Sequence, residues 1–327
     1  MTETLLSAQT VGAHLIRRRL VAPGTPVAAT ELEWGVSNVV LAVEAGDLRA
    51  VVKQALPRLR VAEEWLAKRE RTLTEAEALH LAGRLVPGSV PAVLDVDEEA
   101  CALVVAHAPD AWQNWKAQLL AGDVDPAVAA RLGATLAVWH RETEGDESVA
   151  RRFSDSEAFE QLRVDPYHRT VMRRWPRLER AIGAYVEEML DTRLCLVHGD
   201  FSPKNVLVGP DGCWVLDFEV AHVGDPVFDL AFMLNHLMLK AIHRPEGLEG
   251  YRACASAFLA AYRRDAEPAY LLGHAGCLMV ARVDGKSPAE YLTEGERLLA
   301  RTIGSRLVLD PPATVDDAWE LIAGAVR

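Results

Sequence analysis

Two neighbouring segments decide the fold of this chain: Val197-His198-Gly199-Asp200-Phe201-Ser202-Pro203-Lys204-Asn205-Val206-Leu207-Val208, and Val215-Leu216-Asp217-Phe218-Glu219. Each contains a short apolar run of β type, and the sequence Gly209-Pro210-Asp211-Gly212 between them is typical of a hairpin turn. Two acids and an amide, Asp200, Asn205 and Asp217, would then lie together at one mouth of the hairpin.

These three residues suit phosphoryl transfer. That reaction needs an acid to orient or deprotonate the attacking hydroxyl, and oxygen ligands to hold Mg²⁺ against the nucleotide phosphates. Asp200 fits the first role, whereas Asn205 and Asp217 fit the second. Asp and Asn are also common in turns, because their side chains bond to the backbone. The spacing and the strand context together favour a kinase site.

The pattern H-G-D-x-x-x-x-N followed by L-D-F-E resembles the aminoglycoside phosphotransferase and choline kinase group, relatives of the protein kinases. Downstream, the segment from Gly224 to Ala231 resembles the G-D-P-x-x-D-L-A block of that group. The resemblance implies an α+β, two-lobed, protein-kinase-like fold that binds ATP and Mg²⁺ in its cleft. Asp200 would be the catalytic base, Asp229 a supporting structural acid, and His198 a brace for the loop.

A partial similarity to methylthioribose kinases comes from Asp217-x-Glu219 and from Lys53-Gln54-Ala55-Leu56-Pro57-x-x-Arg60 followed by Glu64-Trp65. The chain is shorter than those kinases usually are, and it has H-G-D-F-S-P-K-N where they carry H-G-D-L-H-T-G-S. The resemblance therefore implies a hydroxyl acceptor of aminoglycoside, sugar or amino alcohol type, without selecting one.

Residues 1–108 are predicted to form a small nucleotide-binding lobe with an antiparallel sheet and one helix. The pattern indicates strands over 31–56 with a turn at 45–47, a helix over about 63–85, and strands over 90–96 and 102–106. By resemblance, Lys53 contacts phosphates and Glu75 orients Lys53, while Glu70 and Glu77 stay open as partners because helix register is not set by sequence.

Two further nucleotide contacts are expected in this lobe. The segment Glu33-Trp34-Gly35-Val36-Ser37-Asn38 occupies the position of the phosphate-covering loop, where Ser37 and backbone N–H groups would face phosphate. The hinge, at about 104–108, would present backbone groups of Ala106 and Ala108 to adenine.

Residues 109–327 are predicted to form a larger, mainly helical lobe with the catalytic loop and the acceptor site. Helical patterns cover 125–142 and 177–190, and short β-type runs cover 194–197, 206–208 and 213–216. The acceptor candidates are polar or aromatic residues of this lobe: Glu219, Arg163, Asp165, Tyr167 and His168, then Asp110, Trp112, Trp115, His222 and His236. The cluster from 163 to 168 is the most suggestive, because basic, acidic and aromatic groups in a Pro-containing segment could grip a polar sugar or amine.

Other segments of the chain receive simpler structural interpretations. Trp112 and Trp115 are expected to pack in the core from one helix. The segment 282–288 reads better as a helix-end turn than as a functional loop. Residues 1–30 and 305–327 are expected to be peripheral.

The composition excludes several other classes of protein. With 35 Lys and Arg against 47 Asp and Glu, the formal charge is −12 over 327 residues, which disfavours a nucleic-acid partner. No apolar run approaches the roughly 20 residues of a membrane span, and Met1-Thr2-Glu3-Thr4 lacks a basic signal-peptide start. We therefore expect a cytoplasmic protein without a membrane partner. Five scattered cysteines match neither a disulfide framework nor a zinc site, and they are expected to be buried.

A catalytically silent, kinase-like nucleotide-binding or regulatory protein is the alternative, because kinase folds can lose activity and keep their shape. The intact set of Lys53, Asp200, Asn205 and Asp217 favours an enzyme. A protein kinase is disfavoured by the missing G-x-G-x-x-G, D-F-G and A-P-E elements. The sequence thus predicts ATP-dependent phosphotransfer to the hydroxyl of a small molecule, and it gives no indication of oligomeric state.

Overall fold

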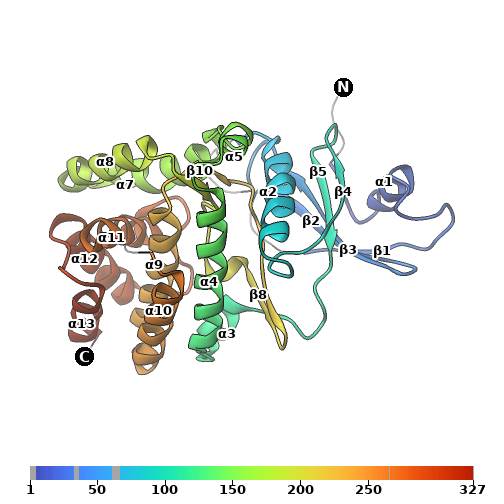
Figure 1. Ribbon diagram of the computed structural model, residues 1–327. Coiled ribbons are helices and arrows are strands. Elements are labelled where there is room, and N and C mark those ends of the chain that lie inside the picture. Colours follow the sequence, from blue (N-terminus) through green and yellow to red (C-terminus); the bar gives the residue numbers. More distant parts are fainter. Residues whose placement is uncertain (1–4, 33–36, 61–66, 265, 327) are drawn as a thin grey trace.

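The computed structural model describes residues 5–32, 37–60, 67–264 and 266–326. The chain forms a small lobe built on a sheet and a larger helical lobe, as predicted (Figure 1). The elements of the small lobe are α1 (Val11–Arg17), β1 (Ala28–Glu31), β2 (Asn38–Ala45), β3 (Leu48–Ala55), α2 (Arg71–Leu85), β4 (Val93–Asp97) and β5 (Ala102–Ala106). Its five strands are antiparallel in the order β1-β2-β3-β5-β4.

The β2–β3 hairpin has the predicted turn. Ala45 pairs with Leu48, so that Gly46 and Asp47 form a two-residue connection. Gly46 has φ +59°, a left-handed conformation that glycine adopts without a steric penalty. Strand β1, which the sequence pattern did not indicate as a separate strand, extends the sheet by pairing with β2.

The sheet is covered by a helix on each face. On β5, Val104 packs with Val11 and Leu15 of α1, whereas its neighbours Leu103 and Val105 belong to the large core that includes α2. Successive strand residues point to opposite faces, so α1 and α2 lie on opposite sides of the sheet. Helix α1 thus lies at the outer end of the molecule, and its apolar side chains form a second small core with the sheet (Figure 1).

Helix α2 begins at Arg71; residues 67–70, which the pattern included in the helix, are not helical, and residues 61–66 lie outside the described part. Arg71 is buried. Its guanidinium donates to the backbone carbonyls of Ser37 at 2.6 Å, Leu56 at 3.0 Å and Ala67 at 3.3 Å. Backbone carbonyls from three separate positions thus converge on a buried cation, which helical spacing in the sequence does not reveal.

The larger lobe is mainly helical. Its elements are β6 (Gln113–Asn114), α3 (Trp115–Ala121), α4 (Pro126–Thr143), α5 (Glu147–Arg152), α6 (Glu157–Phe159), the π-helix η1 (Glu160–Arg169), α7 (Thr170–Arg174), α8 (Pro176–Asp191), β7 (Cys195–Val197), η2 (Pro203–Asn205), β8 (Val206–Gly209), β9 (Gly212–Val215), β10 (His222–Gly224), α9 (Val227–His243), η3 (Pro245–Gly247), α10 (Leu248–Tyr262), α11 (Pro268–Asp284), α12 (Glu294–Leu309) and α13 (Val315–Val326). Helix α4 packs against α2 on one side and α10 on another, so it joins the lobes (Figure 1).

Two small sheets position the decisive segments. Strand β7 pairs with β10 and ends immediately before His198, whereas β8 pairs with both β6 and β9. Trp115 begins α3 and is buried as expected, but Trp112 precedes β6 and is not helical. Its ring packs on Trp214 of β9 instead, with 5.1 Å between centroids.

All five cysteines are buried free thiols, as the composition predicted. Within the described ranges, no helix is both long and apolar enough to cross a membrane.

The packing of α1 on the sheet generates a stability prediction. Leu15 is fully buried, so Leu15→Ala should lower the free energy of unfolding by about 2–5 kcal/mol through lost burial and a residual cavity. Urea unfolding measures this change. Leu94→Thr, at a residue 40% exposed on β4, is the control and should change it by about 0.5 kcal/mol or less. Equal effects of the two substitutions would contradict the packing role of α1.

Candidate active site

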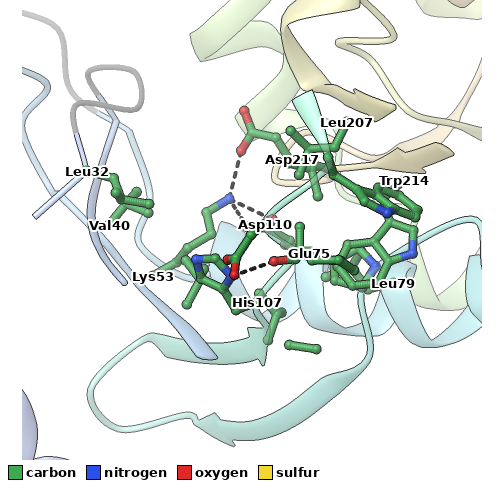
Figure 2. Close-up of a pocket in the computed structure, with 18 residues that line it drawn as sticks. Leu32, Val40, Lys53, Glu75, Leu79, His107, Asp110, Leu207, Trp214 and Asp217 are labelled. Atoms are coloured by element: carbon green, nitrogen blue, oxygen red, sulfur yellow. Dashed lines mark hydrogen bonds and ion pairs between the residues drawn. The ribbon is translucent and has the colours of Figure 1, made fainter. Parts of the chain in front are cut away.

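Lys53 on β3 places its ammonium between carboxylates from the two lobes (Figure 2). Its Nζ lies 2.6 and 2.8 Å from the carboxylate oxygens of Glu75 on α2, and 2.9 Å from Oδ1 of Asp217. Burial alone would lower the pKa of Lys53, but Asp217 and Glu75 raise it above its ordinary value. Glu75 is thus the helix acid that contacts Lys53, whereas Glu77 pairs with Arg152 at 3.2 Å.

Asp217 follows β9 with φ +72°, a backbone conformation that side-chain-bearing residues seldom adopt and that costs about 1–3 kcal/mol. Burial would raise the pKa of its carboxyl, but Lys53 and Lys204 hold that pKa below its ordinary value. The carboxylate is therefore ionised beside Lys53. A strained backbone at an ionised residue is a feature that clusters at functional sites.

Asp200 is fully buried in the loop between β7 and η2. Its Oδ2 receives three donors: Arg163 Nη2 at 2.6 Å, Lys204 Nζ at 2.8 Å and Asn205 Nδ2 at 2.8 Å. Its Oδ1 is buried and has no hydrogen-bond partner among the described residues. Burial would raise the pKa of Asp200, but Arg163 and Lys204 lower it. The result is a buried, ionised carboxylate that is held through one of its two oxygens.

Asn205 orients its amide by donating from Nδ2 to both the side chain and, at 3.0 Å, the backbone carbonyl of Asp200. Its Oδ1 is buried and finds no hydrogen-bond partner in the part of the chain that the structure describes. That oxygen and the Asp217 carboxylate are hard ligands of the kind that Mg²⁺ prefers. The described side chains contain no group of three or more His, Cys, Asp or Glu that could hold a metal. A cation here would therefore need phosphate or water oxygens as well.

His198 joins the two loops that carry the acids. Its Nδ1 accepts the backbone N–H of Asp200, and its Nε2 lies 3.0 Å from the carbonyl oxygen of Leu216. Burial lowers the pKa of His198, so a neutral ring with its proton on Nε2 satisfies both bonds. Asp229 at the start of α9 then accepts the backbone N–H groups of His198 at 2.7 Å and Gly199 at 2.8 Å.

Two cavities, of about 330 and 370 Å³, meet at this site, and both are lined by Lys53 and Asp217. The first is largely apolar, with Leu32 and Val40 on one wall and Leu207 and Trp214 on the other (Figure 2). It is also lined by Ala106, His107 and Ala108, which belong to the predicted hinge, and by Pro109, Asp110 and Trp112. The second is polar, and its lining includes Ser37, Asn38, Asn114, Lys116, Arg163, Tyr167, Lys204, Glu219, Arg282, Ser287 and Glu290.

The structure gathers only some of the acceptor candidates at the second cavity. Arg163, Tyr167 and Glu219 line it, but Asp165 and His168 do not. Asp165 pairs with Arg173 at 3.4 Å, and His168 is fully buried. The reason is that residues 160–169 form the π-helix η1 rather than an open loop, so their side chains point in different directions.

The remaining candidates lie elsewhere. Asp110 and Trp112 line the first cavity, and Asp110 pairs with Arg49 at 2.5 Å. Trp115, His222 and His236 are buried and line neither cavity.

Glu219 connects the lobes beside the second cavity. Its Oε1 accepts from Ser37 Oγ at 2.8 Å, and its Oε2 accepts from Asn38 Nδ2 at 2.9 Å and Arg71 Nε at 3.1 Å. The Ser37 hydroxyl, which the sequence suggested would face phosphate, is thus engaged with Glu219. Residues 33–36 of the predicted phosphate-covering loop lie outside the described residues.

Sequence reasoning missed several residues of the site. Lys204 could have been predicted from the sequence, since it lies in the quoted segment 197–208, next to Asn205. The segment 282–288 does follow the helix-end interpretation, because α11 ends at Asp284, yet its residues 282, 287 and 288 also line the second cavity. Arg71, Lys116 and Glu290 stand in no motif, and only the folded chain brings them to the site.

The sequence matches the phosphotransferase enzyme family over residues 28–297, so the chain belongs to that family. The methylthioribose kinase of Pectobacterium atrosepticum is 27% identical over 88% of this chain and 82% of that enzyme. The methylthioribose kinase of Bacillus cereus is 25% identical over 68% of this chain, and the match covers 63% of that enzyme's length, which is less than two thirds. These relatives make the chain a small-molecule kinase, and they imply that it uses ATP.

Solved structures confirm the predicted kinase-like fold. An amicoumacin kinase in complex with AMP-PNP, Ca²⁺ and Ami has a TM-score of 0.55 at 16% identity, covering 96% of this chain and all of that one. A macrolide 2'-phosphotransferase from Brachybacterium faecium has a TM-score of 0.52 at 18% identity, covering 97% and 98%. A choline/ethanolamine kinase family protein from Mesorhizobium loti also has a TM-score of 0.52, at 16% identity, covering 98% of both chains.

The bonds of Asp229 generate a pH-dependent prediction. Asp229→Asn should lower the free energy of unfolding by about 3 kcal/mol at pH 7, because a buried ionised acceptor is lost from its pair with His140. Although burial raises the pKa of Asp229, its bonds to His140 lower it below 3.8. Its contribution is therefore complete above about pH 4 and disappears as the pH falls through the lower native pKa. Urea unfolding across pH checks this, and wild-type stability in the variant at pH 7 would contradict it.

Proposed function

We propose that this protein transfers the γ-phosphate of ATP to a hydroxyl group of a small molecule in the presence of Mg²⁺. The observation that supports the proposal most is that an apolar cavity and a polar cavity meet at Lys53 and Asp217. The polar cavity also reaches Arg163 and Lys204, which both bind the Asp200 carboxylate. Nucleotide and acceptor would thus occupy separate spaces that share the reacting centre.

The first cavity is the proposed adenosine site. Its volume of about 330 Å³ and its apolar walls suit a flat aromatic base. We propose that the carbonyl of Ala106 and the N–H of Ala108 contact adenine, since the N–H of Ala106 already donates to Ala92 at 2.9 Å. The boundary between a nucleotide-binding lobe and a catalytic and acceptor lobe would lie at 108/109.

Asp200 is the proposed catalytic acid–base residue. The acceptor hydroxyl would donate its hydrogen bond to the unpartnered Oδ1, while Arg163, Lys204 and Asn205 fix Oδ2. The acceptor oxygen bonds to the γ-phosphorus as the bond from phosphorus to the β–γ bridging oxygen breaks, and the hydroxyl proton passes to Asp200. A carboxylate with a low pKa serves this step chiefly by orientation, because a loose transition state demands little proton abstraction.

Lys53, oriented by Glu75, would contact the phosphates, and Ser37 would lie at their edge in the bound state. Asn205 and Asp217 are the proposed ligands of Mg²⁺, since Asp217 lines both cavities and the buried Oδ1 of Asn205 has no hydrogen-bond partner among the described residues. When bound, the cation would neutralise charge on the phosphates.

The acceptor would lie among Arg163, Tyr167 and Glu219 in the second cavity. Asp165 and His168, also predicted for substrate binding, would act only through the placement of η1. Among acceptor types, the methylthioribose kinase relatives favour a sugar over an amino alcohol or an aminoglycoside.

Asp200→Asn tests the catalytic role with minimal change of shape. Turnover should fall by about 100-fold or more, because the acceptor loses its ionised hydrogen-bond partner. ATP binding, measured by calorimetry, should persist. Asp165→Asn, which alters an acid on η1 outside both cavities, is the matched control and should retain turnover. Undiminished turnover in Asp200→Asn would sink the proposed role.

Metal removal tests the Mg²⁺ site. Excess EDTA should abolish ADP release, and added Mg²⁺ should restore it. In Asn205→Ala the Mg²⁺ concentration for half-maximal rate should rise by about 10-fold or more, because one oxygen ligand is missing. An unchanged Mg²⁺ dependence in this variant would remove Asn205 from the metal site.

A further inference from the structure

The second cavity holds more positive than negative charge, although the whole chain carries −12. Three cations line it where α3, η2 and α11 meet: Lys116, Lys204 and Arg282. Lys240 of α9 does not line the cavity but lies over the ring of Tyr291, as Lys116 does. We refer to these four residues as the basic cluster. The one acid that lines this part of the cavity is Glu290, which pairs with Lys116. A site that binds a polycation would have the opposite charge.

Arg282 is the member of the basic cluster whose contacts point most directly to a ligand. It is 8% exposed, and its Nη1 donates to the backbone carbonyl and, at 2.9 Å, to the hydroxyl of Ser287. Its Nε is buried and has no hydrogen-bond partner among the described residues, and none of the described carboxylates forms an ion pair with Arg282. A buried guanidinium donor without a partner is costly unless a ligand supplies the acceptor.

Lys240 adds a second buried cation without a carboxylate partner in the described part of the chain. Its Nζ lies 3.3 Å from the carbonyl of His236 and 5.6 Å from the ring centroid of Tyr291. Burial, together with Lys116 and Arg282, lowers the pKa of Lys240 to about 7. The cations of the cluster therefore repel one another, and an anion bound among them would relieve that repulsion.

We propose that the acceptor carries an anionic group, a carboxylate or a phosphate ester, which binds Arg282 and Lys116 while its hydroxyl faces Asp200. This inference rests on the proposed phosphotransfer and narrows its acceptor class. The nucleotide phosphates are a poor match for the same cations, because Arg282 and Lys116 line only the second cavity, whereas Lys53 and Asp217 line both. Arg282 presents an unused donor, and both anionic groups accept from arginine in a bidentate manner.

Matched acceptor pairs test the proposal. Each pair keeps the carbon skeleton and changes the charge: glycerol against glycerate, glucose against gluconate, and ribose against ribose 5-phosphate. Kanamycin and choline are added as cationic compounds. ADP release with ATP and Mg²⁺ gives kcat/KM, and calorimetry on the ADP complex gives Kd for each compound. Comparing the two carboxylates with the phosphate ester shows which of the two anionic groups the site binds.

The anionic member of at least one pair should be preferred. Arg282→Gln should then lower its kcat/KM or affinity by about 10- to 100-fold, while the KM for ATP stays unchanged. Lys116→Gln should act in the same direction, and Glu290→Gln should strengthen anion binding. Lys286→Gln, which removes a nearby cation that pairs with Asp165 outside the cavity, is the matched control.

The proposal would be overturned if the neutral or cationic compounds were preferred. It would also be overturned if Arg282→Gln lowered kcat/KM or affinity equally for the neutral and the anionic compound of a pair. If no compound is phosphorylated, calorimetry decides: anion binding that weakens in Arg282→Gln supports the proposal, and no binding of any anionic probe overturns it. A different result would contradict the proposed function. If phosphoryl transfer persists when Asp200 is replaced, the proposed role of Asp200 is wrong, whatever the charge of the acceptor. Lys116→Gln keeps the test valid if Arg282→Gln does not fold, since the Lys116 side chain is partly exposed.

Discussion

The buried ammonium of Lys53 is the interaction on which the arrangement of the cleft depends. It is held by Glu75 from the small lobe and Asp217 from the large one, so a single cation links the two lobes in the cleft. Removing ions from water is costly, and the cost is offset only while every partner is present. Asp217 reaches this ammonium from a left-handed backbone conformation, two residues after β9 has ended.

A second layer of contacts keeps that geometry in place. Arg71 and Glu219 form a buried pair across the lobes, and Arg71 also gathers carbonyls from the chain before α2. On the other side, the Asp229 carboxylate and the neutral His198 ring hold the Asp200 loop through backbone bonds. The carboxylates of Asp200 and Asp217 are thus held by neighbouring groups, which keep the proposed site ordered before any ligand arrives.

The sequence predicted what depends on local pattern and failed where distant segments meet. The β2–β3 hairpin, β5 and the strands around Asp200 follow from alternation and turn residues, and the spacing of the motif led to Asp200, Asn205 and Asp217. Arg71 reaches Glu219 across 148 residues, so only tertiary packing reveals it. The segment 163–168 looked like a uniform polar cluster, but η1 disperses its side chains. The local pattern of residues 282–290 predicts a turn, but it does not predict the cavity beside that turn.

Lys204 links the charge of the second cavity to Asp200, the proposed catalytic residue. It binds Asp200 Oδ2 at 2.8 Å and also lines the second cavity, where its charge adds to that of Lys116 and Arg282. Without Arg163 and Lys204, the ionised Asp200 and the nucleotide phosphates would repel an anionic acceptor at short range. With them, the site offsets the charge of Asp200 before the acceptor enters. The further cations, Lys240 on α9 and Arg282 on α11, exceed that need, and the proposed anionic group of the acceptor would neutralise them.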